Sequence, residues 1–175
     1  MDGASSNTVE QVGTMSACVK GVPSYSAWVE YYPNPLATIY GVPVKPGDLM
    51  SAEVSYSGVL KLSISDLTSG KSFSISLPGV QAARSSAEWV AEDPANPQGT
   101  LPLANFGVVN FGGGSSAAGS ADSATIDGIT GPIGGFGSAV VQVQMISSSG
   151  AVKASPSQLS TSGSGFSVTW VSAGP

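Results

Sequence analysis

Short runs in which apolar and polar residues alternate follow one another along most of the chain. Each is as long as a typical strand, and they are SAWVEYY (26–32), MSAEVSYS (50–57), VLKLSISDL (59–67), KSFSISL (71–77), SAEWVAE (86–92), LANFGVVNF (103–111), SAVVQVQMIS (138–147) and FSVTWV (166–171). Turn sequences such as KPGD (45–48) and TSGK (68–71) separate most of them. A period of two indicates strands with one buried face, and no run has a convincing helical period. The pattern predicts an all-β protein, an antiparallel sandwich or barrel, in one domain over residues 1–175.

The period of two also assigns side chains to the faces of individual strands. In the first run it places Trp28, Glu30 and Tyr32 on one face and Ala27, Val29 and Tyr31 on the other. In the SAEWVAE run it places Glu88 and Glu92 on one face, about 13 Å apart, which is too far for them to share a proton. A reactive glutamate would therefore need a partner from elsewhere in the sheet. The alternative is that these glutamates are ordinary exposed residues of a sheet.

Composition narrows the possible functions. Only 10% of residues are charged, the net charge is −5, and six Lys and Arg are spread over the chain, so we expect no nucleic-acid partner and no membrane-surface role. The chain has no histidine, which excludes Ser-His-Asp and Cys-His catalysis and ordinary zinc sites. We expect neither a metal nor another cofactor. With all eleven acids protonated the net charge would be only about +6, so tolerance of acid is expected.

Two further segments have simple interpretations. Cys18 is the single cysteine and cannot form an internal disulfide, so we expect its side chain to be buried and to pack as a small apolar group. FGGGSSAAGS (111–120) lacks the lysine of a phosphate-binding loop and is interpreted as a flexible loop. No run of 18 apolar residues and no signal peptide is found. If the protein is an enzyme, carboxylates and amides must carry its chemistry.

Five segments, in order, resemble the glutamic peptidase (eqolisin, peptidase G1) family. They are VEQVG (9–13), SYSAWVEYYP (24–33), SAEWVAEDP (86–94), LANFGVVNF (103–111) and SATI (123–126). The resemblance implies a double-layer antiparallel β-sandwich of the concanavalin A/lectin-like jelly-roll type, whose concave face binds an extended peptide. It also implies that family strands upstream of Met1 are missing here. YGVPVKPGD (40–48) corresponds to a mobile hairpin beside the family's cleft.

The resemblance assigns roles to five residues. Gln11 and Glu88 correspond to a catalytic dyad, in which the glutamate is general acid and base and the glutamine stabilises the oxyanion. Trp28, Glu30 and Tyr32 correspond to positions that line the substrate cleft. Glu30 could instead hydrogen-bond the glutamine and orient it. Met15 occupies a position where family members commonly carry an acid, which affects the pKa expected for the site.

The implied function is an acid-acting, pepstatin-insensitive endopeptidase with polypeptide substrates. We expect a secreted monomer that needs no metal. A second hypothesis is a non-catalytic β-sandwich module that binds peptide or polysaccharide in the same cleft. A third is a structural surface protein, which would have no cleft and would keep Gln11 and Glu88 apart.

Overall fold

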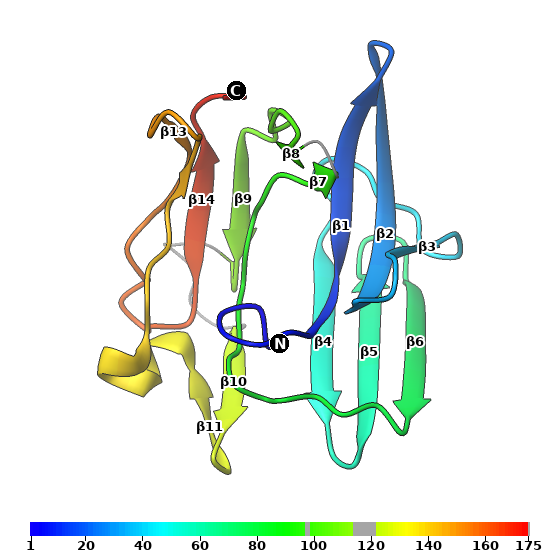
Figure 1. The fold of residues 1–175 in the computed structure, drawn as a ribbon, viewed down its shortest axis with the longest axis vertical. Helices are drawn as coiled ribbons and strands as arrows, with labels where there is room; N and C mark the ends of the chain where they lie inside the picture. The colour runs from blue at the N-terminus through cyan, green and yellow to red at the C-terminus, as the bar shows by residue number, and fades with distance from the viewer. Residues whose placement is uncertain (97–98, 114–121, 175) are drawn as a thin grey trace. The chain divides into compact units, whose positions relative to one another are not determined.

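The computed structural model describes residues 1–96, 99–113 and 122–174, and nearly all of its regular structure is antiparallel β (Figure 1). The chain divides into two compact units, Met1–Glu88 and Trp89–Pro175. Each unit has its own sheets and its own apolar core. Among the described residues there is no helix long and apolar enough to cross a membrane.

The first sheet of the first unit is built on a long hairpin (Figure 1). Its strands are β1 (Val9–Val19), β2 (Val22–Tyr32) and β3 (Ala37–Ile39), in the order β1-β2-β3. Lys20 and Gly21 form the two-residue turn between β1 and β2 with φ angles of 52° and 81°. Positive φ at both positions is the geometry whose twist matches the flanking strands, and glycine adopts it without steric cost. This turn fixes the register of the whole hairpin.

The second sheet contains β4 (Met50–Tyr56), β5 (Val59–Asp66) and β6 (Lys71–Pro78) side by side (Figure 1). The buried Asp66 ends β5 and shapes the turn predicted at TSGK. Its carboxylate accepts hydrogen bonds from the backbone N–H of Thr68 at 2.9 Å and of Ser69 at 3.1 Å, and from the Ser69 hydroxyl. The bond from that hydroxyl is the main cause that lowers the pKa of Asp66, because it favours the ionised form.

A single apolar core joins these two sheets. Its buried residues are Ala27, Ile39, Val42 and Ile64, and Val12, Val29, Val44, Met50 and Phe73 pack against them. Ala27 and Val29 are the residues that the period of two placed opposite Trp28 and Glu30, so the face assignment for β2 is confirmed. Val42 belongs to the predicted lid at 40–48 and is only 2% exposed, which anchors that segment to the core.

The second unit holds the remaining strands. They are β7 (Ala95–Asn96), β8 (Gly99–Thr100), β9 (Val108–Phe111), β10 (Ser123–Ile126), β11 (Ile129–Pro132), β12 (Met145–Ile146), β13 (Val152–Pro156) and β14 (Phe166–Trp170), with a 3₁₀ segment η1 (Ile133–Ala139). Its largest sheet has the order β12-β13-β14-β9. Leu103, Ala154 and Val168 form the core, beside the stacked rings of Phe111 and Phe166. Lys153 is 1% exposed and pairs with Asp93.

Three of the predicted strands are wrong in whole or in part. Residues 80–94 contain no strand, so the spacing predicted for Glu88 and Glu92 along a strand does not apply. Of 103–111 only β9 is a strand, because the Asn105 side chain accepts the Gly107 N–H at 3.0 Å and forms a turn. Of 138–147 only β12 is a strand. The side-chain amide of Gln142 bonds the carbonyl of Pro156, a residue with no N–H to extend the ladder.

Two single-segment expectations have different outcomes. Cys18 is exposed, contrary to the prediction, because it lies opposite Pro23 near the tip of the β1–β2 hairpin, beyond the core. The glycine-rich segment 111–120 falls mostly on residues outside the described ranges, so its interpretation as a flexible loop stays a prediction.

Candidate active site

The register of β1 and β2 places four of the singled-out side chains on one face of the hairpin. Gln11 lies opposite Glu30, Gly13 opposite Trp28, and Val9 opposite Tyr32. Because cross-strand partners point to the same face, Gln11 shares a face with Glu30, Trp28 and Tyr32. Trp28 and Glu30 are half-buried, and Tyr32 is 51% exposed. The opposite face of β2 packs into the core.

Gln11 and Glu30 are joined directly. The Gln11 Nε2 donates a hydrogen bond to Glu30 Oε2 at 2.5 Å. Because Glu30 Oε2 is the acceptor in this bond, Glu30 selects the orientation in which the glutamine presents its NH₂ group. One N–H of that group and the carbonyl oxygen Oε1 remain for other partners. Glu30 thus makes the hydrogen bond that the alternative role requires, and the role itself stays a prediction.

The Trp28 ring packs against Gly13. A Cβ atom added to Gly13 would come within 3.1 Å of Cζ2 of the Trp28 ring, a closer approach than most side chains tolerate. The absence of a side chain at Gly13, two residues after Gln11, therefore leaves room for the indole ring. This packing holds an aromatic surface next to the Gln11 amide.

Residues 1–4, which we call the N-terminal clasp, contact both Glu88 and the start of β1. The Met1 nitrogen lies 3.4 Å from Glu88 Oε2 and donates a hydrogen bond to the carbonyl oxygen of Glu10 at 2.8 Å. A Cβ on Gly3 would lie 3.4 Å from Glu88 Oε2, so the glycine backbone packs against the carboxylate. The other oxygen, Oε1, is buried without a hydrogen-bond partner. The Glu88 carboxylate therefore lies close to the peptide that precedes Gln11.

The two residues of the predicted dyad make no direct hydrogen bond, as far as the described contacts show. They lie instead on β1 and on the segment around residue 88, both of which the clasp contacts. The Gln11 amide is bonded to Glu30, and one Glu88 oxygen has no hydrogen-bond partner. A free amide N–H and an unpaired carboxylate oxygen are the groups that a water molecule and a substrate carbonyl would contact.

Two acids that the sequence analysis did not single out lie behind this arrangement. Asp2 and Glu10 are both 0% exposed. Burial would raise the pKa of Asp2, but hydrogen bonds from Ser85 and Arg84 outweigh it and hold that pKa below its usual range. For Glu10, burial and then the neighbouring Asp2 raise the pKa to about 7. The period of two would have placed Glu10 on the core face, opposite to Gln11, and this was the available signal.

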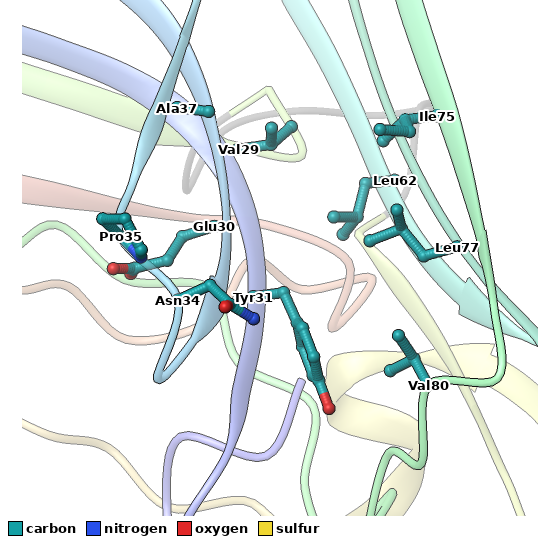
Figure 2. A pocket seen from close by; sticks show the side chains of 10 residues that line it. All are labelled: Val29, Glu30, Tyr31, Asn34, Pro35, Ala37, Leu62, Ile75, Leu77 and Val80. Atoms are coloured by element: carbon teal, nitrogen blue, oxygen red, sulfur yellow. The ribbon is translucent and has the colours of Figure 1, made fainter.

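A hollow of about 400 Å³ opens beside β2, but mainly on the other face of the strand. Figure 2 shows Val29 and Tyr31 on the same side of β2 as Leu62, Leu77 and Val80, whereas Glu30 points to the other side. The hollow is thus an apolar gap between the two sheets of the first unit. It shares only Glu30 with the candidate active site.

No cluster of three or more Cys, Asp or Glu side chains suited to a metal ion occurs within the described ranges. The groups that the site offers are the carboxylate of Glu88 and the amide of Gln11. Both are groups that can move or hold protons without a change in oxidation state.

Comparison with known proteins places the chain among glutamic peptidases. Aspergillopepsin-2 from Aspergillus niger is 29% identical over 141 residues, which are 73% of this chain and 49% of that protein, so the chain spans about half the length of this curated relative. The crystal structure of aspergilloglutamic peptidase from Aspergillus niger matches with a TM-score of 0.76 and 25% identity, over 94% of this chain and 91% of that one. Scytalido-glutamic peptidase, solved with a transition state analog inhibitor, matches with a TM-score of 0.74 and 23% identity, over 97% of this chain and 80% of that one.

These likenesses confirm the predicted antiparallel β-sandwich and the resemblance to glutamic peptidases. The model of the family described as Peptidase A4 matches residues 1–165, which is most of the chain. The protein therefore belongs to the Peptidase A4 family.

Proposed function

We propose that the protein is an acid-acting endopeptidase that hydrolyses peptide bonds with Glu88 and Gln11. The observation that carries the proposal is the pairing of two features in the first unit. An amide is oriented by Glu30 on a face with two aromatic rings, and a carboxylate with one unpaired oxygen is held near the start of the same strand. Family membership supplies the reaction class.

In this proposal Glu88 acts first as a base and then as an acid. The ionised carboxylate removes a proton from water as the water oxygen attacks the carbonyl carbon of the substrate. The proton then passes from Glu88 to the departing amine, and the C–N bond breaks. The carboxylate is regenerated, so no metal or covalent intermediate is needed.

Gln11 stabilises the oxygen that becomes negative during attack. The N–H that is not bonded to Glu30 can donate to this oxyanion, while Oε1 can hold the attacking water. An amide does not titrate in the working range, so acid leaves this part of the site unchanged. Removing one oxyanion donor typically costs about 3 kcal/mol, or roughly a hundredfold in rate.

Trp28 and Tyr32 extend the same face and would contact an extended peptide on either side of the scissile bond. Such a substrate is a polypeptide without required charge complementarity, which suits a chain in which 10% of residues are charged. We further propose that the protein acts outside the cell, where unfolded polypeptide in acid is available as substrate.

The test is cleavage of acid-denatured haemoglobin or casein at pH 3 and at pH 7, with pepstatin present to suppress contaminating aspartic peptidases. Wild-type protein should cleave at pH 3, and Glu88→Gln and Gln11→Ala should lose at least a hundredfold in rate. Glu53→Gln, at an exposed position on β4, is the matched control and should behave as wild type.

The competing binding-module hypothesis predicts the opposite pattern. Folded wild-type protein would bind peptide without turnover, and Glu88→Gln would bind equally well. Equal cleavage by wild type and Glu88→Gln would also reject the proposed mechanism, because it would place the reactive group elsewhere.

A further inference from the structure

The N-terminal clasp holds the segment that carries Glu88 by a set of converging hydrogen bonds. The Asp2 carboxylate accepts the backbone N–H of Arg84 at 2.9 Å and of Ser85 at 2.5 Å, and the Ser85 hydroxyl at 2.9 Å. The backbone N–H of Asp2 donates to the Ser86 carbonyl at 3.2 Å. Residues 84–86 have no strand partner, so these bonds are what fix the backbone two residues before Glu88.

The backbone conformation is unusual both in the clasp and in the segment that it holds. Asp2 and Arg84 have φ angles of 70° and 57°, a region that residues other than glycine seldom occupy. Such conformations persist only where the surrounding contacts favour them strongly, and they often occur at functional sites. The guanidinium of Arg84 lies 5.1 Å from the centre of the Tyr56 ring, which adds an anchor on the β4 side.

Behind Asp2 lies Glu10, whose two oxygens are both buried and receive no hydrogen bond of ordinary geometry from any described donor. The Glu10 N–H donates to the Met1 carbonyl at 3.1 Å and the Met1 nitrogen donates to the Glu10 carbonyl at 2.8 Å, which brings Glu10 next to Asp2, and both acidic side chains are fully buried. The neighbouring Asp2 carboxylate contributes to the raised pKa of Glu10. Two carboxyl groups can form a hydrogen bond only if one carries a proton, and two buried negative charges in contact repel strongly. Asp2 already accepts three hydrogen bonds, which favour its ionised form. The proton therefore resides on Glu10.

Other groups around Glu10 influence its ionisation less than burial and Asp2 do. The Met1 amino group donates a hydrogen bond to the Glu10 carbonyl, and its positive charge lowers the pKa of Glu10, against the effect of Asp2. The same amino group also contacts Glu88. The Thr8 hydroxyl also favours the ionised form, with a smaller effect than burial and Asp2. Arg84 contributes its backbone N–H to Asp2, while its guanidinium lies at Tyr56.

We propose that Glu10, in its protonated form, is a positioning residue that donates a hydrogen bond to Asp2 and so keeps the clasp closed on the segment that carries Glu88. The link to activity rests on the proposed function. Ionisation of Glu10 would place a second buried charge against Asp2, which the weaker effects of Thr8 and the Met1 amino group do not offset, and the clasp would open. Glu88 would then lose its position against Met1 and Gly3.

The pH range over which the clasp stays closed follows from the direction of both shifts. The pKa of Asp2 lies below its ordinary value of 3.8, so the acceptor remains ionised well into acid. The pKa of Glu10 is raised from 4.5 to about 7, so its proton stays bound in the folded state up to near neutrality. Stability from this group is complete below pH 4.5, falls as the pH rises from there to about 7, and is lost above that value. The closed range thus covers acidic conditions.

The effect on stability is large enough to measure. A shift from 4.5 to about 7 corresponds to an increase in the unfolding equilibrium constant of roughly two orders of magnitude across that range. Glu10→Gln keeps the shape and offers a permanent NH₂ donor to Asp2, so it should remove this increase. Glu53→Gln, exposed on β4, should keep the wild-type dependence.

The experiment measures unfolding by urea from pH 4 to pH 9, with hydrogen exchange of the Arg84 and Ser85 amides, in wild type, Glu10→Gln and Glu53→Gln. The same three proteins are also prepared with the additional substitution Glu88→Gln, so that self-cleavage cannot affect the measured stability. We expect wild type to lose stability and amide protection between pH 4.5 and about 7, and Glu10→Gln to keep both. Identical pH dependence in wild type and Glu10→Gln would overturn the proposal.

A second measurement covers the case in which Glu10→Gln fails to fold. The side-chain carbon of Glu10 in wild-type protein, followed by NMR, should titrate near neutrality and move together with the Arg84 and Ser85 amides. A Glu10 that titrates in the ordinary range of a glutamate would overturn the proposal. The two hypotheses fail separately, because a clasp that opens without any cleavage rejects only the proposed function. Cleavage with the same upper pH limit in wild type and Glu10→Gln rejects only the clasp.

Discussion

Replacing Glu30 by glutamine tests whether this residue orients the catalytic amide or merely contacts substrate. The substitution keeps the size of the side chain but removes the charge that accepts the Gln11 N–H at 2.5 Å. A neutral amide can offer either an oxygen or an NH₂ group to Gln11, so the Gln11 amide is no longer held in one orientation.

The expected magnitude follows from the type of bond that is lost. A hydrogen bond to a charged group contributes about 1.5 to 3 kcal/mol, and Glu30 is half-buried, so a value near 2 kcal/mol is appropriate. If that energy is used to place the oxyanion donor, kcat should fall about thirtyfold, since about 1.4 kcal/mol corresponds to a factor of ten. KM should change little, because Glu30 would not touch the substrate.

The assay is steady-state cleavage of a fluorogenic peptide at pH 3, with kcat and KM determined for wild type, Glu30→Gln, Gln11→Ala and the double variant. If Glu30 acts through Gln11, the double variant should be no slower than Gln11→Ala alone. The exposed control Glu53→Gln should match wild type. A raised KM with unchanged kcat, or fully additive losses in the double variant, would refute the orienting role.

Three other experiments test separate parts of the structure. Gly13→Ala should displace the Trp28 ring by a few tenths of an ångström and raise KM, with a change in tryptophan emission; an unaltered KM would show that the ring does not contact substrate. Lys153→Met should lower the free energy of unfolding by about 3 kcal/mol in urea titrations, because it leaves Asp93 with no buried partner, and Asp93→Asn in the same background should recover part of that loss. Cys18 should react fully with a maleimide in the folded protein, and a protected thiol would contradict its exposed position on the hairpin.

The strand and face assignments that succeeded were those with local causes. The period of two identified β2 and assigned its faces because one face packs on Ala27 and Val29 while the other carries Trp28 and Glu30. A one-residue error would have exposed the core residues, so the pattern specifies the register strongly. Gln11 and Glu88 were found by resemblance to the family, and their roles remain predictions.

The segment that carries Glu88 shows why sequence alone failed elsewhere. SAEWVAE alternates like a strand, but the backbone at its start is held by Asp2, whose side chain accepts the N–H of Arg84 from 82 residues away and whose own N–H donates to the Ser86 carbonyl. Contacts of such separation leave no local periodicity. Asp2 was missed for the same reason, since a lone acid in an Asp-Gly pair looks like an ordinary turn residue.

Gln11 and Glu10 are neighbours on one strand, yet they serve opposite faces, and this follows from the register of β1 alone. A slip of one residue would place the amide in the interior and the acid outside, which would remove both the Gln11–Glu30 bond and the contact with Asp2. The register is held at one end by the two-residue turn at Lys20–Gly21 and in the middle by packing of Val12 against the core. A side chain that titrates near neutrality can therefore act on the segment holding Glu88 without entering the face where the peptide is proposed to bind. Because the pleat of the strand separates the two functions, substitutions at Glu10 can alter the pH range of the site while leaving the surface that contacts substrate unchanged.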